Sequence, residues 1–197
     1  MRYILLTLVL GLFFTNATWA QRIKKIEGDP KALSGETQLN VQFTYENMQV
    51  GKYKSEAEYV EDKKADYNKK EEGRGEKWES NWKGDRTARY EPQFIELFEK
   101  HSPFALGNYP TAKYTMIINT SRTEPGFNIY IQRRNAEIDL EITIIETATK
   151  KVVCKYSIKS APGRTFGGND YDTGQRIEEA YAAAGKHFGK ELKGDLK

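Results

Sequence analysis

Two neighbouring stretches of alternating apolar and polar residues constrain the fold of this chain more than any other feature. The first runs from Ala136 to Glu146, and the second from Lys151 to Ser160. Alternation with a period of two over this length is typical of strands that bury one face. Because only a few residues around Thr147–Thr149 separate the two stretches, we predict a β-hairpin.

Charged residues on the polar face of this hairpin indicate its register. If Ile144 lies opposite Val152, glutamates face lysines on the solvent side, and each pair adds about 0.2–1 kcal/mol. These facing pairs are Glu141 with Lys155 and Glu137 with Lys159. A slip by one residue would bury the charges, so the pattern favours this register.

A long helix is predicted after the hairpin, from Gly174 to about Lys193. Its apolar residues recur at steps of four and three, which is the spacing of one helix face. They are Ile177, Tyr181, Ala184, Phe188 and Leu192. Asp172 or Thr173 is the natural N-cap, and we expect the apolar face to pack onto the sheet.

Earlier segments predict further strands and two helices. The strands are expected over Thr37–Tyr45, Lys113–Asn119 and Phe127–Arg133. Ser55 and Glu58 form a capping box, which marks the start of a helix that should end near Lys69. A second, more deeply buried helix is expected between Arg86 and His101. Together these elements predict an α+β fold, a single mainly antiparallel sheet of about five strands with two or three helices packed on one face.

The first twenty residues have the features of a secretory signal peptide. Arg2 supplies a positive start, Tyr3 to Phe14 is apolar, and small residues at Thr18 and Ala20 precede a cleavage site before Gln21. The apolar run is shorter than the roughly 20 residues that cross a bilayer, so we expect no transmembrane span in the mature chain. We therefore expect an exported protein, periplasmic or extracellular after cleavage near Ala20.

The mature chain has the length of one ordinary domain. We expect residues 21–35 to form an N-terminal lead-in and residues 36–197 a single α+β domain. Cys154 is the only cysteine, so no disulfide can form within the chain. It lies on the inward face of its predicted strand, where we expect an inert core thiol. This sparing use of cysteine favours a bacterial envelope protein over a disulfide-rich extracellular module.

The overall charge of the chain indicates no partner. The formal net charge is +3, and 30% of the residues are charged, with both signs interspersed. So small an excess does not indicate nucleic acid or anionic lipid as a partner.

Trp78 and Trp82 are the most unusual residues of a charged segment that also contains several glycines, Glu71 to Asp85. A spacing of four places both indoles on one face if the segment is helical. Two readings remain open. The pair is either an aromatic platform for a sugar ring or a partner segment, or an anchor that pins a long loop to the core.

Two other groups are candidate binding residues. The basic pair Arg133 and Arg134 could bind an anion, or could mark the solvated end of a strand. Asn169 and Asp170, with Asp172 nearby, carry oxygens of the kind that calcium prefers, but their spacing does not fit an EF-hand loop. We therefore predict no metal site and no cofactor.

Catalytic motifs are missing from the sequence. His101 and His187 are the only histidines, and there is no H-E-x-x-H, G-x-S-x-G or paired-cysteine pattern. A carboxylate-only hydrolase stays open, because its two acids need no local spacing. We predict a non-enzymatic envelope protein that binds a protein partner or assists assembly. The alternative is a glycan- or peptidoglycan-binding module that uses Trp78 and Trp82.

The order of elements carries a resemblance. The hairpin over Ala136–Ser160 and the helix over Tyr171–Leu192, with Thr37–Tyr45 as a partner strand, resemble uncharacterised secreted α/β domains of Gram-negative bacteria. The layout is also similar to the periplasmic domain of curli-secretion lipoproteins and to the N-terminal domain of TolB. The chain lacks the lipid-bearing cysteine of the lipoproteins, so the resemblance implies a fold and nothing about secretion.

Overall fold

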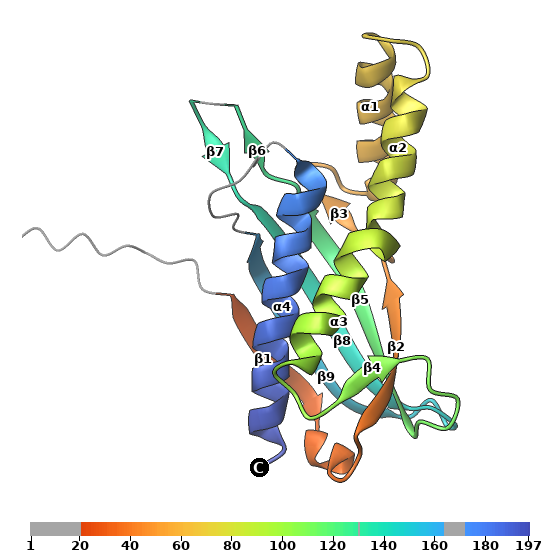
Figure 1. Cartoon of the computed structure of the whole chain (residues 1–197), viewed down its shortest axis with the longest axis vertical. Coiled ribbons are helices and arrows are strands. Elements are labelled where there is room, and N and C mark those ends of the chain that lie inside the picture. Colours follow the sequence, from red (N-terminus) through yellow and green to blue (C-terminus); the bar gives the residue numbers. More distant parts are fainter. Residues whose placement is uncertain (1–20, 130, 164–171) are drawn as a thin grey trace, which may run out of the picture.

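A computed structural model describes residues 21–129, 131–163 and 172–197 (Figure 1). The predicted signal peptide, and the candidate residues Asn169 and Asp170, lie outside these ranges. No helix in the described part of the chain is both long enough and apolar enough to span a membrane.

The described strands form one mixed sheet of seven strands and a separate pair. The order in the large sheet is β1-β9-β8-β5-β2-β4, and β3 pairs with β5 off this path. These strands are β1 (Arg22–Gly28), β2 (Gln38–Thr44), β3 (Gln49–Val50), β4 (Ala105–Gly107), β5 (Tyr114–Glu124), β8 (Ala136–Glu146) and β9 (Val152–Gly163). The α+β class is confirmed, but the sheet has more strands than expected.

The sheet is antiparallel on one side and parallel on the other. The pairs β1–β9, β9–β8 and β8–β5 are antiparallel, whereas β2 is parallel to both β4 and β5, and β3 is parallel to β5. The expectation of a mainly antiparallel sheet fits only the first half. The parallel half arises because the chain crosses from β2 to β5 through the helices, and a crossover of that length permits a parallel pair.

The helices form three continuous segments in the described residues. They are α1 (Glu56–Asn68), the run α2 (Arg74–Asp85), η2 (Arg86–Tyr90) and α3 (Glu91–Glu99), and α4 (Thr173–Asp195), with a short 3₁₀ turn η1 (Pro30–Leu33). Figure 1 shows α3 and α4 side by side across the sheet, and α1 with α2 extending beyond one end of it.

The middle segment runs through a proline without breaking. Pro92 has no N–H to donate to the preceding turn, and its ring would crowd that turn in a regular helix. The residues just before it, Arg86–Tyr90, form a wider π-helical turn. A π-helical turn has one more residue in each hydrogen-bonded backbone ring than an α-helical turn, which makes room for the proline. The predicted helix of Arg86–His101 therefore continues from α2 and does not start afresh.

The core lies between the sheet and the two packed helices. Ile138, Leu140, Ile142 and Ile144 of β8 are fully buried. The close approach of α3 and α4 depends on glycine, since a Cβ on Gly185 would lie 2.3 Å from the Phe94 carbonyl oxygen. That contact explains a glycine in a helix interior, where it costs about 1 kcal/mol relative to alanine.

Two local predictions are confirmed. Asp172 caps α4, with its Oδ1 accepting from the Gly174 N–H at 2.8 Å, and its Oδ2 accepts from Arg89 Nη1 at 2.8 Å. Cys154 is fully buried, and this burial raises its pKa to about 12. The thiol is therefore protonated and shielded from solvent at neutral pH.

The hairpin is confirmed but its predicted register is wrong. Ile144 faces Cys154, not Val152, and Glu141 faces Ser157. Register shifts between Ile138 and Leu140 and between Ile144 and Ile145 displace the strands. Val152, which the predicted register placed opposite Ile144, is 38% exposed.

The expected facing charges have other partners. Lys155 lies 2.8 Å from Glu27 of β1, and Lys159 lies 3.5 Å from Asp139. Glu137 faces Pro162 and accepts from Arg122. β1, which was expected within an N-terminal lead-in, pairs along β9 and supplies the carboxylate of Glu27 to Lys155.

The predicted strand over Phe127–Arg133 is also wrong. Only β6 (Phe127–Asn128) and β7 (Arg133–Arg134) are extended, and they pair with each other. They form a small hairpin that projects from the body between β5 and β8 (Figure 1). The alternation of apolar residues is present here, but it does not face a core.

Candidate functional site

Two projections leave the body at the same end of the sheet (Figure 1). One is the helical arm, which we define as α1 and α2 with their connection. The other is the β6–β7 hairpin, which we define as Gly126–Asn135 with residue 130 outside the description. Together they contain four of the predicted site residues: Trp78, Trp82, Arg133 and Arg134.

The start and the turn of the helical arm follow from local sequence. The Ser55 hydroxyl accepts from the Glu58 N–H at 3.2 Å, which confirms the predicted cap of α1. Gly73 has φ 79°, a left-handed conformation that glycine adopts at little cost and that reverses the chain. A Cβ on Gly75 would lie 2.5 Å from the Lys64 carbonyl oxygen, so glycine lets the two helices touch.

Aromatic rings hold the arm together on its inner side. The Trp78 ring stacks on Tyr67, with centroids 5.7 Å apart, and on Trp82, with centroids 5.8 Å apart. Tyr59 of α1 contacts both indoles, with centroids 5.7 Å and 5.0 Å away. Tyr53 packs edge-on against Tyr59, with ring centroids 5.4 Å apart. Such ring pairs contribute about 0.5–1.5 kcal/mol each beyond the area they bury.

Trp82 belongs to the core, whereas Trp78 lies partly at the surface. Trp82 is 7% exposed, and its Nε1 donates to Glu56 Oε1 at 2.6 Å. The same carboxylate accepts from Arg86, whose guanidinium lies 3.9 Å from the centroid of the Tyr45 ring. The alternative of a long loop is wrong, because the segment is helical, but Trp82 does anchor it to the core.

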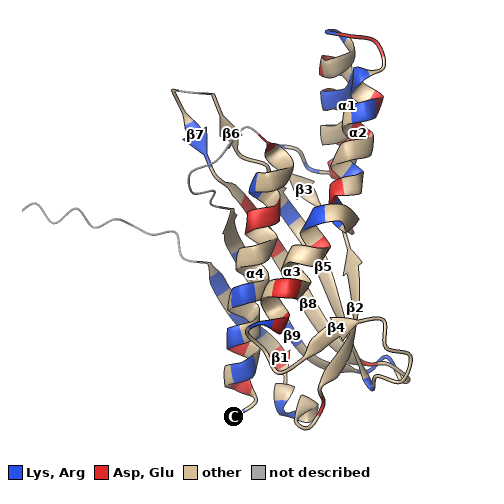
Figure 2. Cartoon of the chain, in the orientation of Figure 1, with Lys and Arg blue, Asp and Glu red and all other residues tan. Residues whose placement is uncertain are grey.

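The outer surface of the arm carries both charge signs (Figure 2). A groove of about 400 Å³ lies between α1 and α2, with Ala57 and Val60 among charged neighbours. Lys64 bridges the two helices to Glu79 at 2.7 Å, and Lys83 reaches the same carboxylate at 2.6 Å. These hydrogen bonds lower the pKa of Glu79 to about 2. A second groove of about 540 Å³ lies near the tip, beside Tyr67, Trp78 and Asn81.

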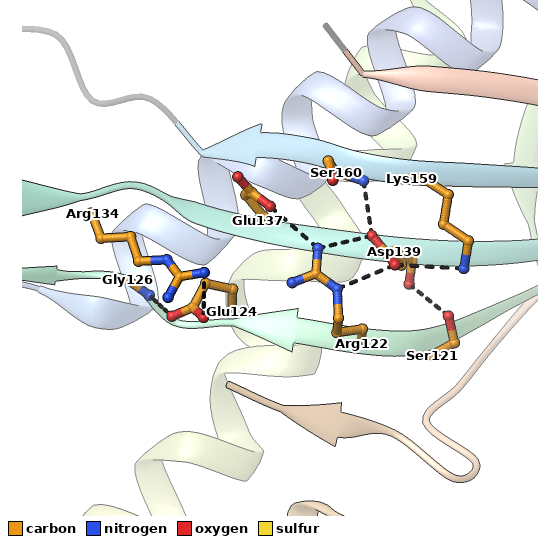
Figure 3. A network of polar contacts seen from close by, with 9 residues as sticks. All are labelled: Ser121, Arg122, Glu124, Gly126, Arg134, Glu137, Asp139, Lys159 and Ser160. Atoms are coloured by element: carbon orange, nitrogen blue, oxygen red, sulfur yellow. Dashed lines mark hydrogen bonds and ion pairs between the residues drawn. The ribbon is translucent and has the colours of Figure 1, made fainter. Parts of the chain in front are cut away.

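The β6–β7 hairpin presents apolar side chains to solvent. Phe127 is 39% exposed, Ile129 57% and Ile131 83%. Its base is held by polar contacts, because Glu124 accepts from Arg134 Nη2 at 3.2 Å and from the Gly126 N–H at 3.1 Å (Figure 3). At Gly126, with φ 65°, a Cβ would lie 2.4 Å from the Arg134 carbonyl oxygen.

A charged network joins β5, β8 and β9 near this base (Figure 3). Arg122 donates to Asp139 through Nε at 3.2 Å and Nη2 at 3.1 Å, and Nη2 also donates to Glu137 at 3.2 Å. Ser160 has φ 53°, and its N–H donates to Asp139 Oδ1 at 2.8 Å. Asp139 thereby accepts a hydrogen bond from a backbone N–H close to the position where the register of β8 and β9 shifts.

The network has a structural role. Burial opposes ionisation of Asp139, but hydrogen bonds from Arg122 and the Ser160 N–H outweigh it, and the pKa of Asp139 is lowered. Asp139 is only 8% exposed. A polar pocket of about 340 Å³ lies beside it, also lined by Asn119 and Glu141. Since the carboxylates and cations of the network satisfy one another, its chemistry serves the fold.

Sequence reasoning missed the features that depend on partners far along the chain. Tyr59 and Tyr67 of the aromatic stack had no signal beyond their helical spacing. Asp139 alternates with apolar residues in its predicted strand, and Arg122 lies beyond the strand predicted over Lys113–Asn119. Among described residues, no group of three or more His, Cys, Asp and Glu side chains could hold a metal ion. His101 lies past the end of α3, its Nδ1 2.8 Å from the Leu97 carbonyl oxygen.

Comparisons with known proteins find similarity in structure only. A scan against protein-family models gives no match, and neither does a search of curated proteins. One similar solved structure is the PelC dodecamer from Paraburkholderia phytofirmans, 8% identical over 88% of this chain and 98% of that chain, with a TM-score of 0.42. A Xanthomonas campestris protein of the DUF330 family is 12% identical over 54% of this chain and 60% of its own, with a TM-score of 0.37.

These matches establish neither a family nor a function. They do not support the resemblance to curli-secretion lipoproteins or to TolB, which stays a prediction from the order of elements.

Proposed function

We propose that this protein is a non-enzymatic binding domain of the cell envelope, and that its helical arm recognises a partner protein. The observation that carries the proposal is the arm itself, a pair of helices that extends past the sheet and is held rigid by its own aromatic stack. A surface fixed before binding loses little conformational freedom on association. The envelope location rests on the predicted signal peptide.

The groove between α1 and α2 has the composition of a protein-binding surface. Ala57 and Val60 are its apolar lining residues, and charged residues of both signs surround them. An apolar centre with a polar rim is the usual anatomy of a protein interface. Mixed charges at a rim select a partner by complementarity more than they add affinity.

The glycan alternative has one observation in its favour and one against it. The groove near the tip combines Tyr67, Trp78 and Asn81, and aromatic and amide groups are suited to sugars. However, the Trp78 ring already stacks on both Tyr67 and Trp82, and Trp82 is buried. A sugar would have to displace a ring contact of the arm, so we favour the protein partner.

Site-specific photo-crosslinking in cells that make the protein tests the proposal. A photoreactive residue at Glu61 or Lys77, both exposed on the arm, should yield a discrete adduct with one envelope protein. Matched positions at Glu141 on the sheet and Lys186 on α4 are also exposed and should yield none. An absence of adducts from the arm, or the same adduct from all four positions, would contradict it.

Tryptophan fluorescence separates the two kinds of partner. Trp78 and Trp82 are the only tryptophans after the predicted signal peptide, so the emission reports on the arm alone. We expect no spectral shift on titration with peptidoglycan or polysaccharide fragments. A saturable shift that is lost in Trp78→Ala would support the glycan alternative instead.

A further inference from the structure

We propose that the β6–β7 hairpin docks this protein on an anionic membrane surface. The inference is independent of the proposed role of the arm, because the two sites share no residue. Its first support is exposure: three of the five large apolar side chains that the described residues expose lie on this one hairpin, namely Phe127, Ile129 and Ile131. The other two are Ile26 and Val152.

Two described backbone N–H groups near the tip of the hairpin have partners within the hairpin. The Ile129 N–H donates to the Gln132 carbonyl oxygen at 3.0 Å, and the Ile131 N–H donates to the Ile129 carbonyl oxygen at 2.8 Å. Backbone groups that enter a bilayer must be satisfied internally, because lipid offers no partners. The N–H groups of Ile129 and Ile131 meet this requirement.

The charge of the hairpin complements anionic headgroups. Residues 125–136 contain two arginines and no acidic residue, and one of the two, Arg134, pairs with Glu124 just before this segment. Arg133 and Arg134 follow directly behind the apolar tip, on β7, which is basic in Figure 2. Stable peripheral binding to a membrane takes two signals, and an apolar surface with basic side chains beside it supplies both.

The local charge of the hairpin leads to a different expectation about a lipid partner than the net charge of the whole chain. A net charge of +3 pointed to no lipid partner, because it averages over every surface. A peripheral membrane contact needs only a local excess, since the attraction falls off within a Debye length of about 8–10 Å.

The shape of the hairpin favours lipid over protein. A stable protein interface buries about 1,200–2,000 Å² in total. The hairpin consists of two strands of two residues each and projects as a narrow tip, which offers no such area. A soft interface surrounds a narrow tip without a preformed pocket, so apolar side chains on it are suited to insertion.

Vesicle co-sedimentation of the processed chain, from Gln21 on, tests the proposal. We expect binding to vesicles of phosphatidylcholine mixed with phosphatidylglycerol, and weaker binding in high salt or with phosphatidylcholine alone. The double change Ile129→Ser with Ile131→Ser should weaken binding on the order of tenfold or more. Arg133→Gln leaves the ion pair of Arg134 with Glu124 in place, and it should weaken the preference for anionic vesicles.

The matched control is Ile26→Ser, because Ile26 is 54% exposed, close to the 57% of Ile129, but lies on β1. It should leave binding unchanged. The proposal fails if the wild-type chain binds neither kind of vesicle, or if the serine pair and Ile26→Ser have equal effects.

A fluorescent probe gives a second readout that does not depend on the affinity of these variants. Since Cys154 is buried, an environment-sensitive dye will label only an introduced cysteine. A dye on Ile131→Cys should shift to the blue and be quenched by lipid-borne quenchers, whereas a dye on Lys77→Cys in the arm should not. Equal responses at both positions, or a response at Lys77→Cys alone, would overturn the assignment of the hairpin.

Discussion

The two projections use apolar residues in opposite ways. The helical arm turns its aromatic rings toward each other and leaves charged residues outside, whereas the β6–β7 hairpin turns its apolar residues to solvent. The arm is held by ring stacking, and the base of the hairpin by ion pairs around Glu124 and Asp139. The number of apolar residues in a projection therefore says little about its binding. What matters is whether the protein's own fold already buries their side chains.

Trp82→Ala should have the largest effect on the arm. It removes a ring that is 7% exposed and stacked on Trp78, together with the donor to Glu56, and we expect a loss of about 3–4 kcal/mol in the free energy of unfolding. Trp82→Phe keeps a ring but loses the donor, and should cost about 1 kcal/mol. Urea unfolding followed by circular dichroism measures both. A cost below about 1 kcal/mol for Trp82→Ala would mean that the stack does not stabilise the arm.

Asp139→Asn tests the charged network near the base of the β6–β7 hairpin. The change leaves Arg122 without its bidentate acceptor, and we expect a loss of about 2–3 kcal/mol. Because the pKa of Asp139 is lowered in the folded protein, its contribution is complete above the unfolded pKa of about 3.9 and is lost as pH falls through the folded value.

Unfolding measured from neutral to acidic pH isolates this contribution. The wild-type chain should lose stability on acidification more steeply than Asp139→Asn, so the gap between them should narrow below pH of about 4. Ile142→Ala serves as the control, since it removes only buried apolar atoms and its gap from the wild type should not change with pH. A constant gap for Asp139→Asn would show that the carboxylate charge contributes nothing.

Trp78→Ala should cost less than Trp82→Ala, because Trp78 is only partly buried. We expect about 1–2 kcal/mol, from the loss of its stacking on Tyr67 and Trp82. The same urea titration measures it, with the exposed neighbour Lys77→Ala as a control that should stay within about 0.5 kcal/mol of the wild type. Equal costs for the two tryptophans would contradict the distinction between a core ring and a surface ring.

Sequence reasoning succeeded where the cause is local. The alternation over Ala136–Glu146 and Lys151–Ser160, the capping box at Ser55 and the N-cap at Asp172 all depend on residues close together in the chain. Cys154 was assigned to the core for the same reason, because its strand has one apolar face.

Sequence reasoning failed where distant segments decide the outcome. The register of β8 and β9 depends on slips that Asp139 and Ser160 stabilise, and no pattern within the hairpin reports them. β1 lacks alternation and pairs because β9 offers it an edge. The spacing of Trp78 and Trp82 predicted neighbouring rings, but not that α1 would supply two more on the same side.

Phe127, Ile129 and Ile131 are the most instructive failure. Their alternation predicted a strand with a buried face, and the structure leaves that face in solvent. Periodicity reports which side chains share a face, but it cannot report whether another element covers that face.

Ile131→Ser should have the smallest effect on stability of the changes considered, and it is the sharpest test of this contrast. Because Ile131 is 83% exposed, removing its apolar side chain should change the free energy of unfolding by less than about 0.5 kcal/mol. Ile138→Ala, at a fully buried position of β8, should cost about 2–5 kcal/mol under the same conditions. A loss above about 1 kcal/mol for Ile131→Ser would mean that the side chain packs against the body in solution, and the hairpin would then have no apolar tip to offer a membrane.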